Sequence, residues 1–268
     1  MGARKKRKPL VALVLSFLTP GLGQFYNGQI KRAAILYLGG LSLLTLLILS
    51  GSFSTFWGML FSLVVGIGFL LFVIIDAPCN AARIKEIHLR SYNRWYIYPI
   101  IVLVNLFVIN PAISSILPFK AYKIPAGSME PTLLVGDHFV ADKTIYGAKK
   151  PVRNDIVVFR YPEDRSKDFI KRIIGTPGDK IQIQDRQIFI NEQLYDDKYG
   201  YYDEKVRNPN RSFGPVVVPK DHYFVLGDNR DHSLDSKFFG FVPFSDLKGR
   251  ALYIYWAKDK GRIGKYLN

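Results

Sequence analysis

The sequence predicts a multi-span α-helical membrane anchor followed by a mainly antiparallel β domain. Long uncharged apolar runs occur only in residues 1–118, while short alternating runs with Gly/Pro turns fill residues 119–268. The net charge of +15 is concentrated in the apolar half, where the only acids are Asp76 and Glu86. Basic residues beside apolar runs are typical of cytoplasmic loops of membrane proteins, so we expect no nucleic-acid partner.

Three apolar runs in residues 1–118 are long enough to cross a bilayer. They lie at about 33–50, 56–75 and 95–118, each near the roughly 20 residues that a spanning helix needs. The third run begins with Trp95, Tyr96 and Tyr98, aromatic residues of the kind that gather at membrane interfaces. We therefore expect three crossings.

The first apolar stretch, residues 9–23, is shorter and is broken by Pro20, Gly21 and Gly23. It is predicted to be interfacial or re-entrant, because basic residues flank both its ends. A cleaved signal peptide is the alternative, although residues 24–27 make a poor small-residue cleavage site. The segment 20–28 resembles the Pro-Gly-x-Gly-x-x-Tyr-x-Gly signature of small two-helix membrane modules, to which we assign no chemistry.

Basic residues also predict the orientation of the anchor. They cluster at 4–8, at 31–32 and at positions 83, 85, 90 and 94, and the positive-inside rule places all three clusters in the cytoplasm. With three crossings, residues 119–268 then lie outside the cytoplasm.

The β domain is predicted from short runs rich in β-branched and aromatic residues, separated by turns such as Thr176-Pro-Gly-Asp179. Between them, residues 195–214 are expected to form a long loop. The predicted strands cover 138–143, 155–160, 168–174, 180–184, 187–191, 222–226 and 250–256.

Two residues of this domain stand out as a nucleophile and a base. Ser128 follows a glycine in a proline-containing segment, and Lys171 lies in an apolar strand on the same face as Phe169. Burial among apolar neighbours lowers the pKa of a lysine and so makes it a usable base. The alternatives are a turn serine, a lysine that snorkels to the surface, and a Ser-His-Asp triad using His138, His222 or His232.

Metal chemistry is not expected. The alternating acids Asp231 and Asp235 lack the glycine and closing glutamate of a calcium loop. The single Cys79 excludes a multi-thiolate site and an intramolecular disulfide. No HExxH or P-loop occurs either, so we predict no metal and no cofactor.

Four stretches together resemble bacterial type I signal peptidases, also called leader peptidases. They are Gly-Ser-Met-x-Pro-Thr-Leu at 127–133, Arg-Asn-Asp-Ile-Val-Val-Phe at 153–159, Lys-Arg-x-x-Gly-x-Pro-Gly-Asp at 171–179, and Gly-Asp-Asn-Arg-Asp-x-Ser-x-Asp-Ser at 227–236. They occur in the family's order and span most of residues 122–243. The membrane half lies outside the usual family pattern, which has one or two N-terminal spans. The helical hairpin formed by the spans at 33–50 and 56–75 is therefore interpreted as an addition to that pattern.

The resemblance implies roles for individual residues. Ser128 matches the nucleophile, Lys171 the general base, and Ser233 the serine that orients the lysine. The backbone N–H of Ser128 would serve the oxyanion hole. Residues that match the polar support of the site loop are Asp228, Arg230 and Asp235. Positions that match the substrate-binding surface for small side chains are Ile124, Pro125, Ala126, Met129, Leu133 and Ile170.

The sequence departs from the family pattern at three positions. Ala126 stands where many members carry a serine that assists the oxyanion, Asn154 replaces a glycine, and Lys237 replaces a common arginine. A lysine there can make only a point-charge contact with Asp235, whereas an arginine could bind the carboxylate through two hydrogen bonds.

The resemblance implies an endopeptidase that removes signal peptides from exported preproteins with Ala-x-Ala-like cleavage sites. It would be a multi-pass protein of the bacterial inner (cytoplasmic) membrane, partnered by the lipid bilayer, with its catalytic domain on the periplasmic side. Two other functions were weighed: a self-cleaving Ser/Lys protease, whose relatives are soluble, and a non-enzymatic scaffold. The three spans argue against the first, and intact Ser128, Lys171 and Ser233 argue against the second.

Overall fold

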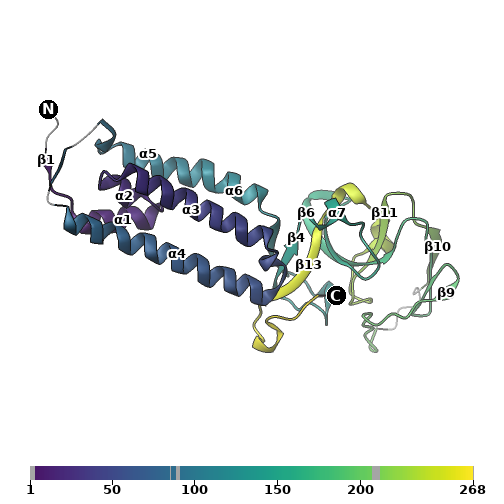
Figure 1. Cartoon of the computed structure of the whole chain (residues 1–268). Helices are drawn as coiled ribbons and strands as arrows, with labels where there is room; N and C mark the ends of the chain where they lie inside the picture. Colours follow the sequence, from purple (N-terminus) through teal and green to yellow (C-terminus); the bar gives the residue numbers. More distant parts are fainter. Residues whose placement is uncertain (1–3, 85, 89–90, 207–211, 268) are drawn as a thin grey trace. The chain divides into compact units, whose positions relative to one another are not determined.

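The computed structural model describes residues 4–84, 86–88, 91–206 and 212–267. The chain divides into two compact units, residues 1–117 and 118–268 (Figure 1). Lys85 and Arg90 of the third basic cluster and part of the predicted loop 195–214 fall outside the described residues.

The first unit is helical, which confirms the predicted multi-span anchor. Three helices are long and apolar enough to cross a membrane: α3 (Ile30–Leu49), α4 (Phe56–Arg83) and the continuous helix Ile97–Ile116. The third of these consists of α5 (Ile97–Val104), a π-helical segment η3 (Asn105–Ile109) and α6 (Asn110–Ile116). The remaining elements are α1 (Pro9–Leu18), α2 (Leu22–Tyr26), the short helices η1 (Ser52–Ser54) and η2 (Ser91–Asn93), and the paired strands β1 (Arg4–Lys5) and β2 (Ile87–His88).

Helix α4 continues eight residues beyond the predicted end at residue 75. The prediction stopped there because Asp76 is charged, but in the structure this carboxylate is bound inside the unit. It accepts hydrogen bonds from Gln24 at 3.0 Å, from Asn80 at 2.9 Å, and from both Nε and Nη2 of Arg32. A charge satisfied in this way does not force the helix to end.

The π-helical segment of the third span has a local cause. Pro111 has no backbone N–H and cannot donate to the carbonyl four residues earlier. The helix ladder is therefore interrupted just before it, and the preceding turn widens to the π form.

The glycine motif at 20–28 acts as a packing device between α1, α2 and α4. A Cβ on Gly23 would lie 2.2 Å from the Ala12 carbonyl oxygen and 2.7 Å from the Ala77 Cβ, so only glycine fits. Gly21, with φ of +86°, breaks the chain between α1 and α2. Gln24 and Asn27 donate to the carbonyls of Val73 and Ala77 on α4, at 2.9 and 2.8 Å.

The second unit is the predicted antiparallel β domain. Seven strands form one sheet in the order β12-β11-β6-β5-β13-β4-β3, and four form another in the order β10-β7-β8-β9. In chain order the strands are β3 (Phe119–Lys123), β4 (His138–Asp142), β5 (Ile156–Tyr161), β6 (Asp164–Gly175), β7 (Lys180–Gln184), β8 (Gln187–Ile190), β9 (Gln193–Leu194), β10 (Phe213–Val217), β11 (His222–Leu226), β12 (Val242–Pro243) and β13 (Leu247–Trp256). Each predicted strand corresponds to one of them. Strands β3, β9, β10 and β12 were not predicted, and β10 begins inside the expected loop.

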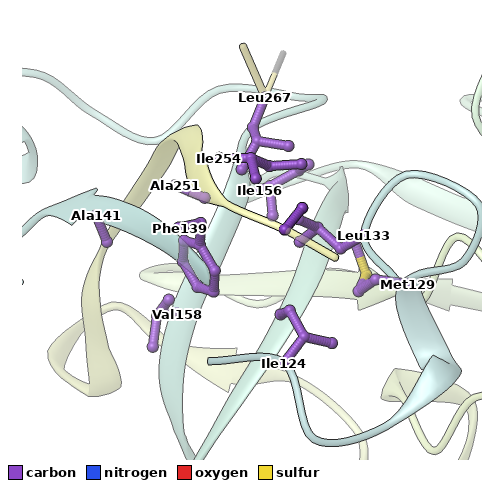
Figure 2. Packing of buried hydrophobic residues seen from close by; sticks show 11 residues of the cluster. Ile124, Met129, Leu133, Phe139, Ala141, Ile156, Val158, Ala251, Ile254 and Leu267 are labelled. Carbon is purple, nitrogen blue, oxygen red and sulfur yellow. The ribbon is translucent and has the colours of Figure 1, made fainter. Parts of the chain in front are cut away.

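Short helical turns complete this unit: η4 (Gly127–Met129), α7 (Ile145–Ala148), α8 (Ser236–Phe239), η5 (Phe244–Asp246) and η6 (Lys260–Arg262). A core of buried apolar side chains lies beneath η4 (Figure 2). It includes Ile124, Met129 and Leu133, which come from the segment around Ser128, and Phe139 and Ile254 from the sheet. The segment that carries Ser128 is thus anchored on both sides of the serine.

Candidate active site

The fold brings Ser128 and Lys171 together from distant parts of the chain. Ser128 lies in the turn η4 between β3 and β4, and Lys171 lies on β6 in the middle of the seven-stranded sheet. The Lys171 Nζ donates a hydrogen bond to the Ser128 Oγ over 2.7 Å and a second to the Ile170 carbonyl over 3.1 Å. Lysine and serine are therefore in direct contact across 43 residues of sequence.

The environment of Lys171 disfavours its charged form. The side chain is only 3% exposed, and its Nζ lies 5.4 Å from the centre of the Phe169 ring. Burial lowers the pKa of Lys171 from 10.5 to about 8, although the carboxylates of Asp235 and Asp228 act in the opposite direction. At pH 7 about one tenth of this amine is therefore unprotonated, and at pH 8 about one half.

The segment 227–236 wraps around the serine from the other side. It follows β11, whose Leu226 pairs with Arg172 of β6, so the segment begins next to Lys171. Asn229 donates from its backbone to the Ser128 carbonyl and from its side chain to the Gly127 carbonyl, both over 3.1 Å. Gly227 admits this approach, because a Cβ there would lie 2.4 Å from the Ser128 carbonyl oxygen.

A buried ion pair fixes this segment to β6. The Arg172 guanidinium donates two hydrogen bonds to Asp228, at 2.9 and 2.7 Å, and both side chains are fully buried. Arg172 also lies 3.6 Å above the Tyr199 ring. A two-pronged contact of this kind sets orientation as well as distance, so it holds the loop beside Lys171.

The other predicted supporting residues also lie in this segment. Arg230 is buried and donates to Asp197 at 2.8 Å. Asp235 is fully buried, which raises the pKa of its carboxyl, and it accepts from the Gly227 and Lys237 amides. The Lys237 ammonium is 3.9 Å from this carboxylate, a distance that fits a point-charge contact.

Ser233 is expected to orient Lys171. Its hydroxyl is buried without a hydrogen-bond partner among the residues that the structure describes. It lies near enough to Asp235 to lower the pKa of that carboxyl, but the geometry falls short of a hydrogen bond. The expected bond to Lys171 stays a prediction, since the two acceptors of the lysine are Ser128 and Ile170.

A groove of about 380 Å³ opens beside Ser128 and Lys171. Three of the six predicted substrate-binding residues line it, namely Pro125, Ala126 and Ile170. The other three, Ile124, Met129 and Leu133, are at most 1% exposed and belong to the core beneath it (Figure 2). Their predicted contact with substrate is therefore untested.

Sequence reasoning missed several groove residues. Asp168, Phe169, Asn229, His232 and Leu234 line it as well. Phe169 could have been found, because it shares a strand face with Lys171. Asp168 lies on the same strand, β6, as Lys171. Asn229, His232 and Leu234 line the groove because β11 brings the following loop next to β6, a pairing that the sequence alone does not reveal.

In the described part of the chain it is Lys171, and not a histidine, that hydrogen-bonds to Ser128, although His232 lines the groove. His138 contacts Tyr255, His222 contacts the Lys220 carbonyl, and His232 lies 3.5 Å from Asp203. Among the residues that the structure describes, no group of three or more His, Cys, Asp or Glu side chains is placed so that it could hold a metal ion.

Comparison with known proteins places this site in a family. The family model described as "Signal peptidase, peptidase S26" matches residues 94–256, more than half of the chain. The chain belongs to this signal peptidase family. The "Probable signal peptidase I-2" of Synechocystis is 42% identical over 143 residues, covering 51% of this chain and 63% of that protein. The "Signal peptidase I" of Aquifex aeolicus is 34% identical, covering 58% of this chain and 83% of that protein.

The chain is also similar in sequence to a solved structure. The crystal structure of a signal peptidase I from Enterococcus faecalis is 33% identical, covering 38% of this chain and 97% of that one, with a TM-score of 0.34. The family match ends on the amino-terminal side at residue 94, so α1 to α4 lie outside it. Membership of this family supports a signal peptidase function and a membrane anchor for this chain.

Proposed function

We propose that this protein is a membrane-anchored endopeptidase that removes signal peptides from preproteins with a Ser128/Lys171 dyad. The observation that carries the proposal is the 2.7 Å contact between the Lys171 Nζ and the Ser128 Oγ, on a lysine whose pKa is lowered to about 8. A nucleophilic serine needs a base within hydrogen-bond reach, and this buried amine is the base that the geometry supports best.

The reaction follows from this contact. The neutral Lys171 amine accepts the Ser128 proton while the Oγ attacks the scissile carbonyl carbon. The resulting tetrahedral oxyanion collapses, and the ammonium returns the proton to the departing amine of the mature protein. The signal peptide then remains as an ester on Ser128. Lys171 then deprotonates a water molecule, which attacks the ester carbon of this acyl-enzyme. The bond from that carbon to the Ser128 Oγ breaks, the Lys171 ammonium returns the proton to Oγ, and the signal peptide leaves with a new carboxylate.

The turn η4 suits the proposed oxyanion hole. The N–H groups of the first residues of a helical turn have no partner inside the turn, and Ser128 is the second residue of η4. Its amide is therefore available to the oxyanion, as the family resemblance implies. Ala126 supplies no second hydroxyl donor. Small substrate side chains, as in an Ala-x-Ala motif, would fit against Pro125, Ala126 and Ile170 in the groove.

The proposed membrane setting has a physical advantage. A preprotein carries its cleavage site at the end of an apolar segment that enters the bilayer. Three spanning helices hold the protease in the same membrane, which raises the effective concentration of each partner for the other. We place the protein in the bacterial inner membrane, with the β domain on the periplasmic side.

The test is cleavage of a preprotein by the full chain in proteoliposomes. Ser128→Ala and Lys171→Met should each lower the rate by more than about 10³-fold, because a nucleophile and its base act as a unit. Matched controls are Ser166→Ala and Lys167→Met, which alter exposed side chains of β6, the strand that carries Lys171. A folded Ser128→Ala protein that still releases the mature product would rule out the dyad.

A further inference from the structure

The helical unit contains a groove that the proposed protease function does not use. It has a volume of about 430 Å³ and is lined almost entirely by apolar side chains of α2, α3 and the third span. Representative lining residues are Phe25, Ala34, Ile101 and Val104. A second apolar cavity of about 320 Å³ adjoins it and shares Pro20, Tyr37 and Asn105 with it.

The structure builds this groove from irregular features. The π-helical segment begins at Asn105, which is 8% exposed and donates to the Tyr37 hydroxyl over 3.0 Å. Asn105 and Ile109, the two ends of this segment, both line the groove. π-Helical turns within α-helices are rare and occur frequently at functional sites. The Thr19 hydroxyl also lies in the groove lining, is buried, and has no partner among the described residues.

The groove lies at the basic end of the unit. It is lined by the first two turns of α3, where Lys31 precedes Ala34 by one turn on the same side of the helix. Arg94 lies three residues before α5, the helix whose Ile100 and Ile101 line the groove. Lys31 and Arg94 are both exposed, and neither pairs with an acid in the described part of the chain. Arg32, in contrast, is already paired with Asp76.

A third cation at this end also lacks an anion. Arg7 is 5% exposed, lies 4.2 Å above the Tyr26 ring, and its Nε and Nη2 have no partner among the described residues. Tyr26 follows Phe25, which lines the groove. A buried guanidinium without a counter-charge is unfavourable, and Asp76, one of the unit's two acids, is already paired with Arg32.

We propose that this groove binds an anionic phospholipid, with an acyl chain in the apolar channel and the phosphate at Lys31 and Arg94. In a membrane-spanning unit, a lipid acyl chain is the expected occupant of an apolar groove. Basic pockets between helices at the cytoplasmic side are known to hold anionic headgroups. The apolar segment of a preprotein is the competing occupant. Charge disfavours this segment, because the region of a signal peptide that precedes it is positively charged and would be repelled by Lys31 and Arg94.

The experiment measures the phospholipid that the full chain retains. The protein is reconstituted with equal amounts of dioleoyl phosphatidylglycerol and dioleoyl phosphatidylcholine, extracted in mild detergent, and analysed by native mass spectrometry. We expect retained phosphatidylglycerol to exceed phosphatidylcholine. Each of the substitutions Lys31→Gln and Arg94→Gln should lower that ratio by about fivefold. An equal retention of both lipids by the unaltered protein would overturn the proposal.

A matched pair of substitutions tests the acyl channel separately. Ala34→Phe places a ring in the groove, whereas Ile35→Phe adds a ring to the next residue, which is 68% exposed and lines neither cavity. Ala34→Phe should abolish lipid retention, and Ile35→Phe should leave it unchanged. Equal retention by both variants would contradict the channel. A photoreactive group at Val104 gives a second test. If it cross-links to the apolar segment of a preprotein, and added phosphatidylglycerol does not reduce the yield of this cross-link, the lipid proposal is contradicted.

Discussion

At the residue scale, the chemistry depends on how strongly the sheet disfavours one ammonium group. Lys171 lies on β6 next to Phe169 and to the largely buried loop 227–236. The neighbouring carboxylates Asp228 and Asp235 favour its charged form, yet burial has the larger effect and lowers its pKa to about 8. Lys171 can therefore act as a base near neutral pH even though Asp228 and Asp235, which hold the loop in place, lie close to it.

This balance predicts the pH dependence of cleavage. Only the neutral amine can accept the serine proton, and its fraction rises from about one tenth at pH 7 to one half at pH 8 and about nine tenths at pH 9 for a pKa near 8. The rate should therefore increase by about fivefold between pH 7 and pH 8 and level off above pH 9. The measurement is kcat/KM against pH on one preprotein-derived peptide.

Phe169→Ala provides the comparison for this profile. The substitution admits water to the ammonium, so the pKa of Lys171 should rise and the curve should move to higher pH. A profile that stays flat from pH 7 to 9, with acyl transfer shown to be rate-limiting, would exclude a lysine base.

Other properties of single residues could not be read from the sequence. Met129 and Leu133 flank Ser128 in the same motif as Ala126, yet the structure places both in the core and leaves Ala126 in the groove. The motif identifies the neighbourhood of the serine, but which side chains face inward depends on the turn η4 and the sheet beneath it. Periodicity has little power in such irregular segments.

At the scale of elements, the active site depends on how the β11 loop is joined to β6. Asp228→Asn removes the charge that compensates Arg172 while keeping the side-chain shape. Breaking one partner of a fully buried ion pair costs about 3–5 kcal/mol, because the remaining charge stays buried. We expect the melting temperature of the β domain to fall by roughly 10 °C, with a loss of cleavage as Asn229 leaves Ser128.

The control for this prediction is an exposed pair. Lys180 and Glu192 are 2.9 Å apart but largely solvated, so Glu192→Gln should leave the melting temperature unchanged. Equal melting temperatures for the two variants, measured by circular dichroism on the full chain in detergent, would mean that the buried pair does not stabilise the domain.

Helix packing in the membrane unit yields a second prediction at this scale. Gly23→Ala would force a Cβ to within 2.2 Å of the Ala12 carbonyl oxygen and 2.7 Å of the Ala77 Cβ, so α2 must move away from α1 and α4. We expect a lower melting temperature of the helical unit in detergent. Gly68→Ala is the matched control, since nothing lies within 4 Å of its Cβ. If both variants melt like the unaltered protein, the glycine motif is not a packing device.

The elements themselves could be predicted unevenly from the sequence. The three long apolar runs became α3, α4 and the third span because a spanning helix needs little more than length and hydrophobicity. The apolar run at 56–75 did not reveal that helix α4 continues to Arg83, since the contacts of Asp76 with Arg32 and Gln24 cross 44 and 52 residues. The edge strands β9 and β12 have only two residues each and leave no periodic signal.

At the scale of the whole molecule, function depends on which side of the membrane the β domain occupies. That side is decided by the number of crossings that precede residue 118. The structure has three helices long enough to cross, while α1 has only ten residues and is separated from α2 by the turn at Gly21. Three crossings place the β domain opposite residues 4–8, and a fourth through residues 9–23 would return it to their side.

We predict three crossings, with the β domain outside the cytoplasm. Protease added to intact spheroplasts should digest the chain after residue 119, because the basic clusters at 4–8, 31–32 and 83–94 hold their segments inside. Cys79 provides an internal reporter. It is exposed and lies in α4 just before the third cluster, so a membrane-impermeant maleimide should label it only after permeabilisation. Protection of the β domain together with labelling of Cys79 from outside would mean that the anchor is inverted or that residues 9–23 do cross. Protection of the β domain with Cys79 still unlabelled would mean that the third helix, Ile97–Ile116, fails to cross. Either result would remove the proposed protease from the side on which it meets its substrates.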